Sequence, residues 1–169
     1  VFTTGLDNTL KRWDTDSWSV VNSIDLKCLG KSLLVDGETG TILVGMGNGS
    51  LAEYSLDDLN LISTLTVSSS VISKVIQLSS GHVMTCSYDG SVCLPFRDNV
   101  PMKVSDRNIS SIVELSDNKI ACCCDDGLRI ISPPVIYDRT LLSRINSISL
   151  SLDSIRKSAS DQKPQLISL

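Results

Sequence analysis

The chain of 169 residues is long enough to fold as a domain with its own hydrophobic core. Its net charge of −4 and its scattered lysines and arginines argue against binding to a nucleic-acid backbone. No apolar run approaches the ~18–20 residues that a membrane-spanning helix needs. We therefore expect a globular protein whose partners include neither nucleic acid nor membrane. Val1 stands directly inside a strand-like pattern, so we also expect the amino terminus to be a cut rather than a natural beginning.

One short pattern occurs four times along the chain, as VFTTGLDNTLKRWD, TILVGMGNGSLAEYS, HVMTCSYDGSVCLPF and KIACCCDDGLRIIS. In each copy two runs of strand-forming residues flank a pair of turn residues: Asp7-Asn8, Asn48-Gly49, Asp89-Gly90 or Asp126-Gly127. Such pairs predict β-hairpins with two-residue turns, because both residues accept a positive φ. The turns are 41, 41 and 37 residues apart, which is the spacing of four-stranded propeller blades.

Further strand patterns lie between the hairpins at matching offsets. They predict outer strands at 18–25, 59–67, 101–105 and 135–142, and opening strands at 31–36, 72–78, 109–115 and 145–152. Each predicted strand is closely followed by its neighbour. The sequence therefore predicts an all-β protein made of four-stranded antiparallel blades with meander connections.

The first copy, GLDNTLKRWD with its terminal Trp13-Asp14, resembles the WD40 repeat. In the other copies Tyr54, Phe96 and Ile131 stand in the place of the tryptophan. The Gly-His pair that precedes the opening strand in this family has no counterpart, since Gly81-His82 lies between an opening strand and a hairpin.

This resemblance implies a β-propeller. Residues 1–152 are expected to form WD40-like blades with corners near 7, 48, 89 and 126, and residues 153–169 a Ser-rich polar tail or the start of a truncated unit. In the family a Ser or Thr, an Asp, a His and a Trp form a hydrogen-bond network that pins a blade. By position Thr3, Asp7 and Trp13 match three members in the first blade, and Thr85 and Asp89 match two in the third. Without the histidine we expect this network to be incomplete.

The predicted strands amount to about four blades, fewer than the six to eight that are usual for such propellers. One alternative is a piece of a larger propeller, which we favour. The other is a closed ring, in which the strand at 145–152 adds to the sheet that Val1 begins. A piece leaves two blade faces uncovered, so we expect it to be unstable or to associate when isolated.

No group of residues indicates catalysis or metal binding. His82 is the only histidine and lies in a predicted loop, without a GxSxG motif. The pairs Asp57-Asp58 and Asp125-Asp126 are typical of turns and solvated surfaces, and Asp14-Thr15-Asp16 lacks the glycine and glutamate of a calcium loop. The glycines of Gly45–Gly49 belong to a hairpin rather than to a phosphate-binding loop. We expect no catalytic, cofactor-binding or metal-binding residues.

The six cysteines suit neither a disulfide framework nor a zinc site, because Cys122, Cys123 and Cys124 are consecutive and alternate between the faces of a strand. They favour buried, reduced thiols in a cytoplasmic protein. A two-residue turn at Asp89-Gly90 would place Cys86 opposite Cys93, as a reduced pair or as a redox-sensing one. Near the end of the chain, Arg156-Lys157-Ser158 has the form of a phosphorylation site directed by basic residues.

The resemblance implies a non-catalytic scaffold for protein interactions within a larger protein or complex. Its partners would be other proteins, and also the remaining blades of its own full-length chain. Two alternatives stay open: a propeller-fold hydrolase or lyase with acids at the channel, and a regulatory propeller of a multidomain signalling protein. Three or more carboxylate or histidine side chains in one pocket would favour the enzyme.

Overall fold

The chain divides into two compact units, Val1–Pro133 and Pro134–Leu169, and the computed structural model describes residues 1–133. The predicted strands at 135–142 and 145–152, the predicted tail at 153–169 and the Arg156-Lys157-Ser158 motif lie outside the described residues. Among the described residues, no helix has the length and apolar character needed to cross a membrane.

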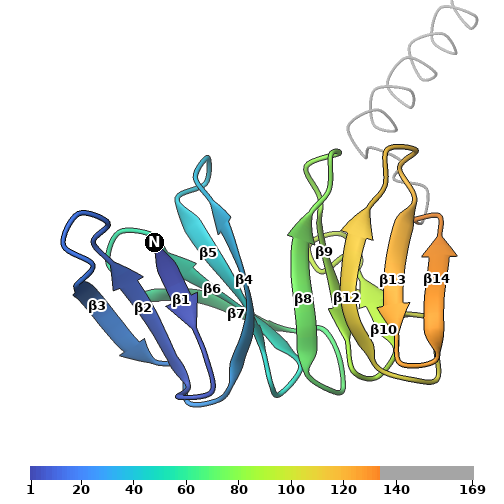
Figure 1. Ribbon diagram of the computed structural model, residues 1–169, viewed down its shortest axis with the longest axis horizontal. Coiled ribbons are helices and arrows are strands. Elements are labelled where there is room, and N and C mark those ends of the chain that lie inside the picture. Colours follow the sequence, from blue (N-terminus) through green and yellow to red (C-terminus); the bar gives the residue numbers. More distant parts are fainter. Residues whose placement is uncertain (134–169) are drawn as a thin grey trace, which may run out of the picture. The chain divides into compact units, whose positions relative to one another are not determined.

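Residues 1–133 form four antiparallel sheets, in which each strand pairs with the next one along the chain (Figure 1). We number the sheets in chain order, so that sheets 1 and 4 have three strands each and sheets 2 and 3 have four. All-β folding and meander connectivity are thus confirmed for residues 1–133. The strands are β1 (Phe2–Thr4), β2 (Thr9–Trp13) and β3 (Val20–Asp25) in sheet 1; β4 (Gly30–Asp36), β5 (Thr41–Met46), β6 (Ser50–Ser55) and β7 (Leu61–Thr66) in sheet 2; β8 (Ile72–Gln77), β9 (Val83–Ser87), β10 (Ser91–Cys93) and β11 (Met102–Lys103) in sheet 3; and β12 (Ile109–Glu114), β13 (Ile120–Cys124) and β14 (Gly127–Ile131) in sheet 4.

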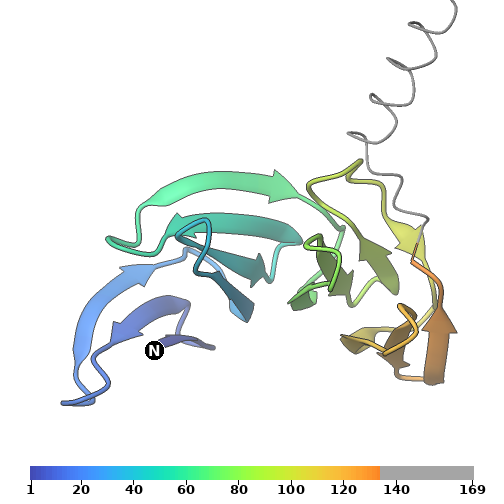
Figure 2. The same ribbon diagram turned by 90° about the horizontal axis from the view of Figure 1, so that it is seen from above.

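The sheets follow one another side by side in chain order, as Figure 2 shows. Their first strands are neighbours, because β4 contacts β8 and β8 contacts β12. The last strand of sheet 2, β7, lies at the far edge and is exposed along most of its length. Each sheet therefore runs from an inner first strand to an outer last strand, as a propeller blade does.

Apolar side chains fill the spaces between successive sheets. Leu10 of sheet 1 packs with Ile42 and Val44 of sheet 2, and Leu43 of sheet 2 packs with Ile72 of sheet 3. Val44 and Leu43 are consecutive in β5 and belong to different clusters, since successive side chains of a strand point to opposite faces. This is why residues 42–46, ILVGM, include no polar side chain: β5 is covered on both faces, as in a strand buried within a layered core.

The first strands of sheets 2, 3 and 4 carry a β-bulge at the same place. Register shifts leave one extra residue in each strand, namely Lys31 in β4, Ser73 in β8 and Ser110 in β12. The Ser73 hydroxyl donates a hydrogen bond to the carbonyl of Ile109 at 2.5 Å, and so links sheet 3 to sheet 4. In sheet 2 the Ser32 hydroxyl, next to the bulge, accepts the Val75 N–H at 3.0 Å and links sheet 2 to sheet 3. Hydroxyl groups thus join the inner strands of successive sheets.

The hairpin loops lie at or next to the predicted turn residues, but the first three loops are longer than expected, and the fourth consists of Asp125-Asp126 rather than Asp126-Gly127, because Gly127 pairs with Cys124. The pairing of Cys86 with Val92 leaves Tyr88, Asp89 and Gly90 in the loop, so the loop has three residues. Only its last residue has a positive φ, which is 80° at Gly90, and the Gly90 N–H donates to the Ser87 carbonyl at 3.1 Å. This is a turn closed by one residue in the left-handed region. Asn8 and Gly49 have the same role in the first two loops, and the fourth loop has two residues.

The longer loop makes the predicted opposition of Cys86 and Cys93 wrong. With one more residue in the turn, Cys86 pairs with Val92 and Cys93 pairs with Thr85, so the two thiols lie on opposite faces of sheet 3. Cys93 packs against sheet 2, whereas Cys86 lies 3.2 Å from the Ser73 hydroxyl on the side of sheet 4. Burial raises the pKa of Cys86 to about 12 and that of Cys93 to about 11, so both thiols stay protonated at neutral pH.

Phe96 also differs from its expected place. It was predicted to replace the repeat tryptophan at the end of a strand, but β10 already ends at Cys93 and the Phe96 side chain is exposed. Pro95 follows shortly after the strand and cannot donate to the sheet ladder, which accounts for the early end of β10.

The glycines of the loops allow a matched test of the fold. Gly90 and Gly81 have nearly the same φ, 80° and 81°. A Cβ atom at Gly90 would lie 1.9 Å from the Ser105 carbonyl oxygen, whereas one at Gly81 meets nothing within 4 Å. We expect Gly81→Ala to cost about 1 kcal/mol of unfolding free energy from backbone strain alone. Gly90→Ala should cost at least about 2 kcal/mol more, because the loop must move away from Ser105.

Urea unfolding followed by circular dichroism measures both variants against the parent chain. Equal losses in the two variants would contradict the close packing of this hairpin against the loop between sheets 3 and 4.

Candidate functional site

A group of hydroxyls surrounds the carboxylate at the third hairpin. Asp89 Oδ2 accepts hydrogen bonds from the hydroxyls of Ser68, at 2.5 Å, and Ser69, at 3.1 Å. Its other oxygen accepts the N–H of Ser91 at 2.9 Å. Ser68 is buried in the loop that leads into sheet 3, and its hydroxyl also lies 2.6 Å from that of Ser87. The carboxylate therefore ties the hairpin to the loop that precedes its sheet.

The same arrangement recurs in sheet 4, where the Ser105 hydroxyl donates to Asp126 at 3.2 Å. In both sheets the serine precedes the aspartate by 21 residues. The resemblance implied a network that lacks its histidine, but in sheets 3 and 4 a serine from the preceding loop reaches the aspartate. The recurring interval is the signal by which the sequence could have revealed these serines.

In sheet 1 the hydrogen bond implied by the resemblance is present, since Trp13 Nε1 donates to the Thr3 hydroxyl at 2.8 Å. Asp7 instead bonds within its own hairpin, to the Lys11 ammonium at 2.6 Å and to the Thr9 N–H at 3.2 Å. The hydrogen bonds from Lys11 and Thr9 lower the pKa of Asp7 to about 2.

The pKa of Asp89 reflects its surroundings in the fold more than that of Asp7, because the Asp89 carboxylate is partly buried. Burial by itself would raise its pKa, but the hydrogen bonds from Ser68, Ser91 and Ser69 outweigh burial and lower the pKa below its usual range. The folded state thus favours the ionised form of the Asp89 carboxyl group.

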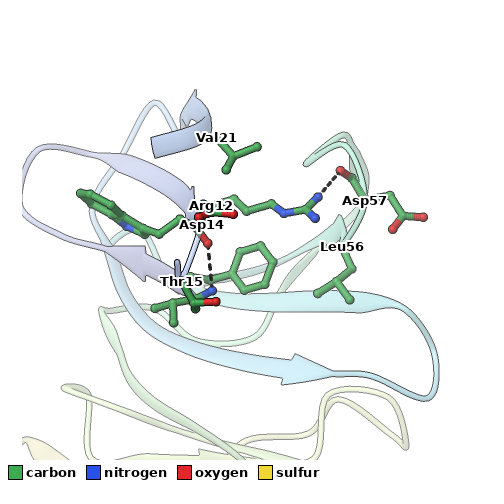
Figure 3. Close-up of a pocket in the computed structure, with 9 residues that line it drawn as sticks. Arg12, Asp14, Thr15, Val21, Leu56 and Asp57 are labelled. Atoms are coloured by element: carbon green, nitrogen blue, oxygen red, sulfur yellow. Dashed lines mark hydrogen bonds between the residues drawn. The ribbon is translucent and has the colours of Figure 1, made fainter. Parts of the chain in front are cut away.

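A hollow of about 410 Å³ lies between sheets 1 and 2, at the end of the sheets opposite the hairpin loops (Figure 3). Figure 3 shows Val21 and Leu56 on either side of the Arg12 side chain, whose guanidinium group points toward Asp57. Arg12 Nη1 donates to the Asp57 backbone carbonyl at 2.8 Å. The lining combines apolar groups with one cation and two acids: Val1, Phe2, Arg12, Trp13, Asp14, Thr15, Val21, Leu56 and Asp57.

The elements around the hollow are fixed by local hydrogen bonds. Asp14 Oδ1 accepts the N–H groups of Asp16 and Ser17, at 3.0 and 2.7 Å, and so shapes the turn between β2 and β3. The turn between β6 and β7 carries Asp57 and Asp58, whose backbone carbonyls accept hydrogen bonds from Arg12 and from Asn22, the latter at 3.0 Å. The pair Asp57-Asp58 therefore lies in a turn, as predicted. A guanidinium has five N–H donors, so Arg12 retains donors beyond its bond to Asp57.

Within residues 1–133 no three His, Cys, Asp or Glu side chains form a group that could hold a metal ion. A second hollow, of about 470 Å³ between sheets 2 and 3, has two carboxylates in its lining, Asp36 and Glu38. His82 lies in the loop between β8 and β9, where its Nδ1 atom is 3.3 Å from the Ser80 hydroxyl. The requirement of three converging acids or histidines is therefore not met at either hollow.

The glycines of Gly45–Gly49 have packing roles. A Cβ atom at Gly45 would lie 2.7 Å from the Ile72 side chain of sheet 3, and one at Gly49 would lie 2.1 Å from the Ser68 carbonyl oxygen. Both glycines are therefore needed for the close approach of sheets 2 and 3. This agrees with their assignment to a hairpin rather than to a phosphate-binding loop.

No protein-family model matches the sequence, and no curated protein matches it. The structure is similar to that of the solved WD40 beta propeller domain of Doa1, with a TM-score of 0.69 and 18% sequence identity. The fold is that of a WD40 β-propeller. The match covers 79% of this chain and 47% of the solved one, so the chain spans about half the length of that propeller. Each of the four sheets corresponds to one blade.

The carboxylate of Asp89 gives a pH-dependent prediction. Its pKa in the folded state lies below the unfolded value of about 3.9, so its contribution to stability is complete above that pH and is lost as the pH falls. We expect Asp89→Asn to lower the unfolding free energy at pH 7 by about 1–3 kcal/mol. The difference between the variant and the parent should shrink when the pH is lowered through the acid range.

Urea titrations at several pH values measure this difference directly. Ser69→Ala, which removes one exposed donor and leaves Ser68 in place, should have the smaller effect. A difference between Asp89→Asn and the parent that stays constant across the acid range would contradict the role of the ionised carboxylate.

Proposed function

We propose that the protein is a non-catalytic scaffold for protein interactions, acting in the cytoplasm as part of a larger protein or complex. Its similarity to a WD40 propeller supports the scaffold role, because folds of this type present rigid surfaces on which loops and turns form binding sites. The enzyme alternative is not favoured, since neither hollow described above joins three acidic or histidine side chains.

The observation that carries the proposal is the hollow between sheets 1 and 2. Its apolar side chains, Phe2, Val21 and Leu56, surround a cation that keeps unused N–H donors. Binding sites of proteins combine such an apolar surface with a few polar groups that fix the orientation of the ligand. We propose that an extended segment of a partner protein inserts an apolar side chain here and places a carbonyl or carboxylate oxygen on Arg12.

The repeat supplies a matched pair of variants for a test. Val21 in β3 and Ile62 in β7 are both bulge residues of outer strands, 41 positions apart, with exposed fractions of 59% and 55%. Val21 lines the hollow, whereas Ile62 does not. Replacing either residue with aspartate has a similar effect on exposed apolar surface, but only Val21→Asp places a carboxylate in the proposed site.

We expect short peptides selected from a random phage-displayed library on the full chain to bind the parent and the Ile62→Asp variant equally. Val21→Asp should weaken them by at least about tenfold, corresponding to about 1.4 kcal/mol. Fluorescence anisotropy with the labelled peptides measures the affinities, and circular dichroism verifies that both variants are folded. Peptides that bind Val21→Asp as tightly as the parent would contradict docking at this hollow.

A further inference from the structure

The outer strand of sheet 1, β3, has an open backbone edge. Among the described strands β3 pairs with β2 alone, in unbroken register from Asp25 to Asn22. Just beyond this stretch the Leu26 N–H donates to the Asn8 carbonyl at 2.8 Å. Residues of an antiparallel strand bond alternately toward the neighbouring strand and away from it, so Ser23 and Asp25 direct their N–H and carbonyl groups to the open side. A further strand can pair with these groups.

Sheet 2 shows what such an edge accepts. The Val67 N–H donates to the Gly49 carbonyl at 3.0 Å, so the same alternation directs the N–H and carbonyl of Thr66 in β7 to the open side. The Thr66 carbonyl accepts a hydrogen bond there from the Asn99 side-chain amide at 2.9 Å. Thr66 follows Asp25 by 41 residues, at the equivalent position of the next sheet. An amide N–H from outside the sheet thus occupies an outward carbonyl, as an added strand would do at β3.

The other outer strands are protected in ways that β3 is not. Short strands, charged side chains and covering loops keep an edge from pairing with another chain. β11 has two residues, β14 carries Arg129 at its centre, and Asn99 covers the end of β7. β3 has six residues and is uncharged over residues 20–24. Sheets stack through their faces, and β7 remains exposed although sheet 2 is covered on both faces, so the edge of β3 does not depend on a missing neighbour.

The open edge is continuous with the hollow between sheets 1 and 2. Val21 lines the hollow and lies two positions before Ser23 on the same strand. Figure 3 shows the Val21 side chain beside that of Arg12. An extended segment rises about 3.3 Å per residue, so about six residues reach from the hollow to Asp25. A segment with one side chain in the hollow is therefore placed alongside β3.

The charges of the hollow favour a backbone carbonyl over a carboxylate as the ligand of Arg12. Among the side chains that line it, Asp14 and Asp57 outnumber this cation. Hydrogen bonds from Ser17 and Asp16 hold the pKa of Asp14 below its usual range, so Asp14 is ionised at neutral pH. A partner carboxylate would meet repulsion from these acids. A carbonyl has no net charge, and every residue of an extended segment offers one.

We propose that the partner is an extended protein segment that joins sheet 1 as an additional strand along β3, with one apolar side chain in the hollow and no acidic residue beside it. This inference rests on the proposed docking at the hollow and adds the binding mode. The segment donates its N–H groups to the carbonyls of Ser23 and Asp25 and accepts their N–H groups on its own carbonyls. Backbone pairing supplies affinity, and the side chain in the hollow supplies specificity.

The test is N-methylation of each backbone nitrogen in turn, in peptides selected on the full chain. A methyl group removes the N–H donor, and an added strand bonds through every second residue of its own. We expect methylation at alternate positions to weaken binding at least about tenfold, and methylation at the positions between them to change it less than about twofold, as measured by fluorescence anisotropy.

The result with Val21→Asp separates this inference from the docking on which it rests. Peptides that are weakened by Val21→Asp but tolerate a methyl group at every position, or lose affinity without alternation, would overturn strand addition and leave docking at the hollow supported. Peptides that are insensitive to Val21→Asp would contradict both.

Proline at the edge gives a matched pair of variants in the protein itself. Ser23 in β3 and Thr64 in β7 are 41 residues apart, are exposed, and direct their N–H groups to the open side by the same alternation. Proline lacks an N–H and is tolerated in edge strands where that group faces solvent. We expect Ser23→Pro to weaken the selected peptides at least about tenfold and Thr64→Pro to leave them unchanged.

Circular dichroism verifies that both proline variants are folded. Equal affinities of the two folded variants would overturn the placement of the partner at β3. The methylation experiment uses the parent chain, so it decides the question even where Ser23→Pro does not fold.

Discussion

The structure depends on the covering of both faces of sheets 2 and 3 by the neighbouring sheets. A four-stranded sheet with two apolar faces cannot bury them alone, and sheet 2 shows how stacking solves this: Val44 packs toward sheet 1 and Leu43 toward sheet 3. The inner strands are held at the same time by two hydrogen bonds to the backbone of the following sheet: the Ser32 hydroxyl accepts the Val75 N–H, and the Ser73 hydroxyl donates to the Ile109 carbonyl. Apolar burial supplies most of the stabilisation, and the directional bonds fix how far each sheet is displaced along its neighbour.

The repeated strand–turn–strand pattern was sufficient to predict the sheets and their order. Runs of Val, Ile, Leu and Thr around Asx-Gly pairs indicate hairpins whatever their exact loop length. The loop length could not be predicted from the sequence, because a glycine in the left-handed conformation occurs both in two-residue turns and at the end of three-residue loops. A difference of one residue reverses the faces of all side chains on one strand, which is why Cys86 and Cys93 were placed together and in fact lie apart.

The candidate site was much less predictable. The hollow forms where β2 and β3 meet the turn between β6 and β7, and the bond from Arg12 to Asp57 spans 45 residues. The acceptor of this hydrogen bond is a backbone carbonyl, a group that every residue possesses. The residue type at position 57 therefore does not indicate the contact. The resemblance to the repeat family did identify Thr3 with Trp13, because those two residues match its motif directly.

The serines that reach Asp89 and Asp126 have a consequence for how the blades respond to their surroundings. In the repeat family a histidine belongs to this network, and an imidazole with an ordinary pKa near 6.5 changes its charge within the physiological range. A hydroxyl has no such transition. The hydrogen bond from Ser68 to Asp89, whose pKa lies below its usual range, therefore keeps the same proton arrangement from mildly acidic compartments to mildly alkaline ones. The corner of sheet 3 is consequently insensitive to pH over that interval.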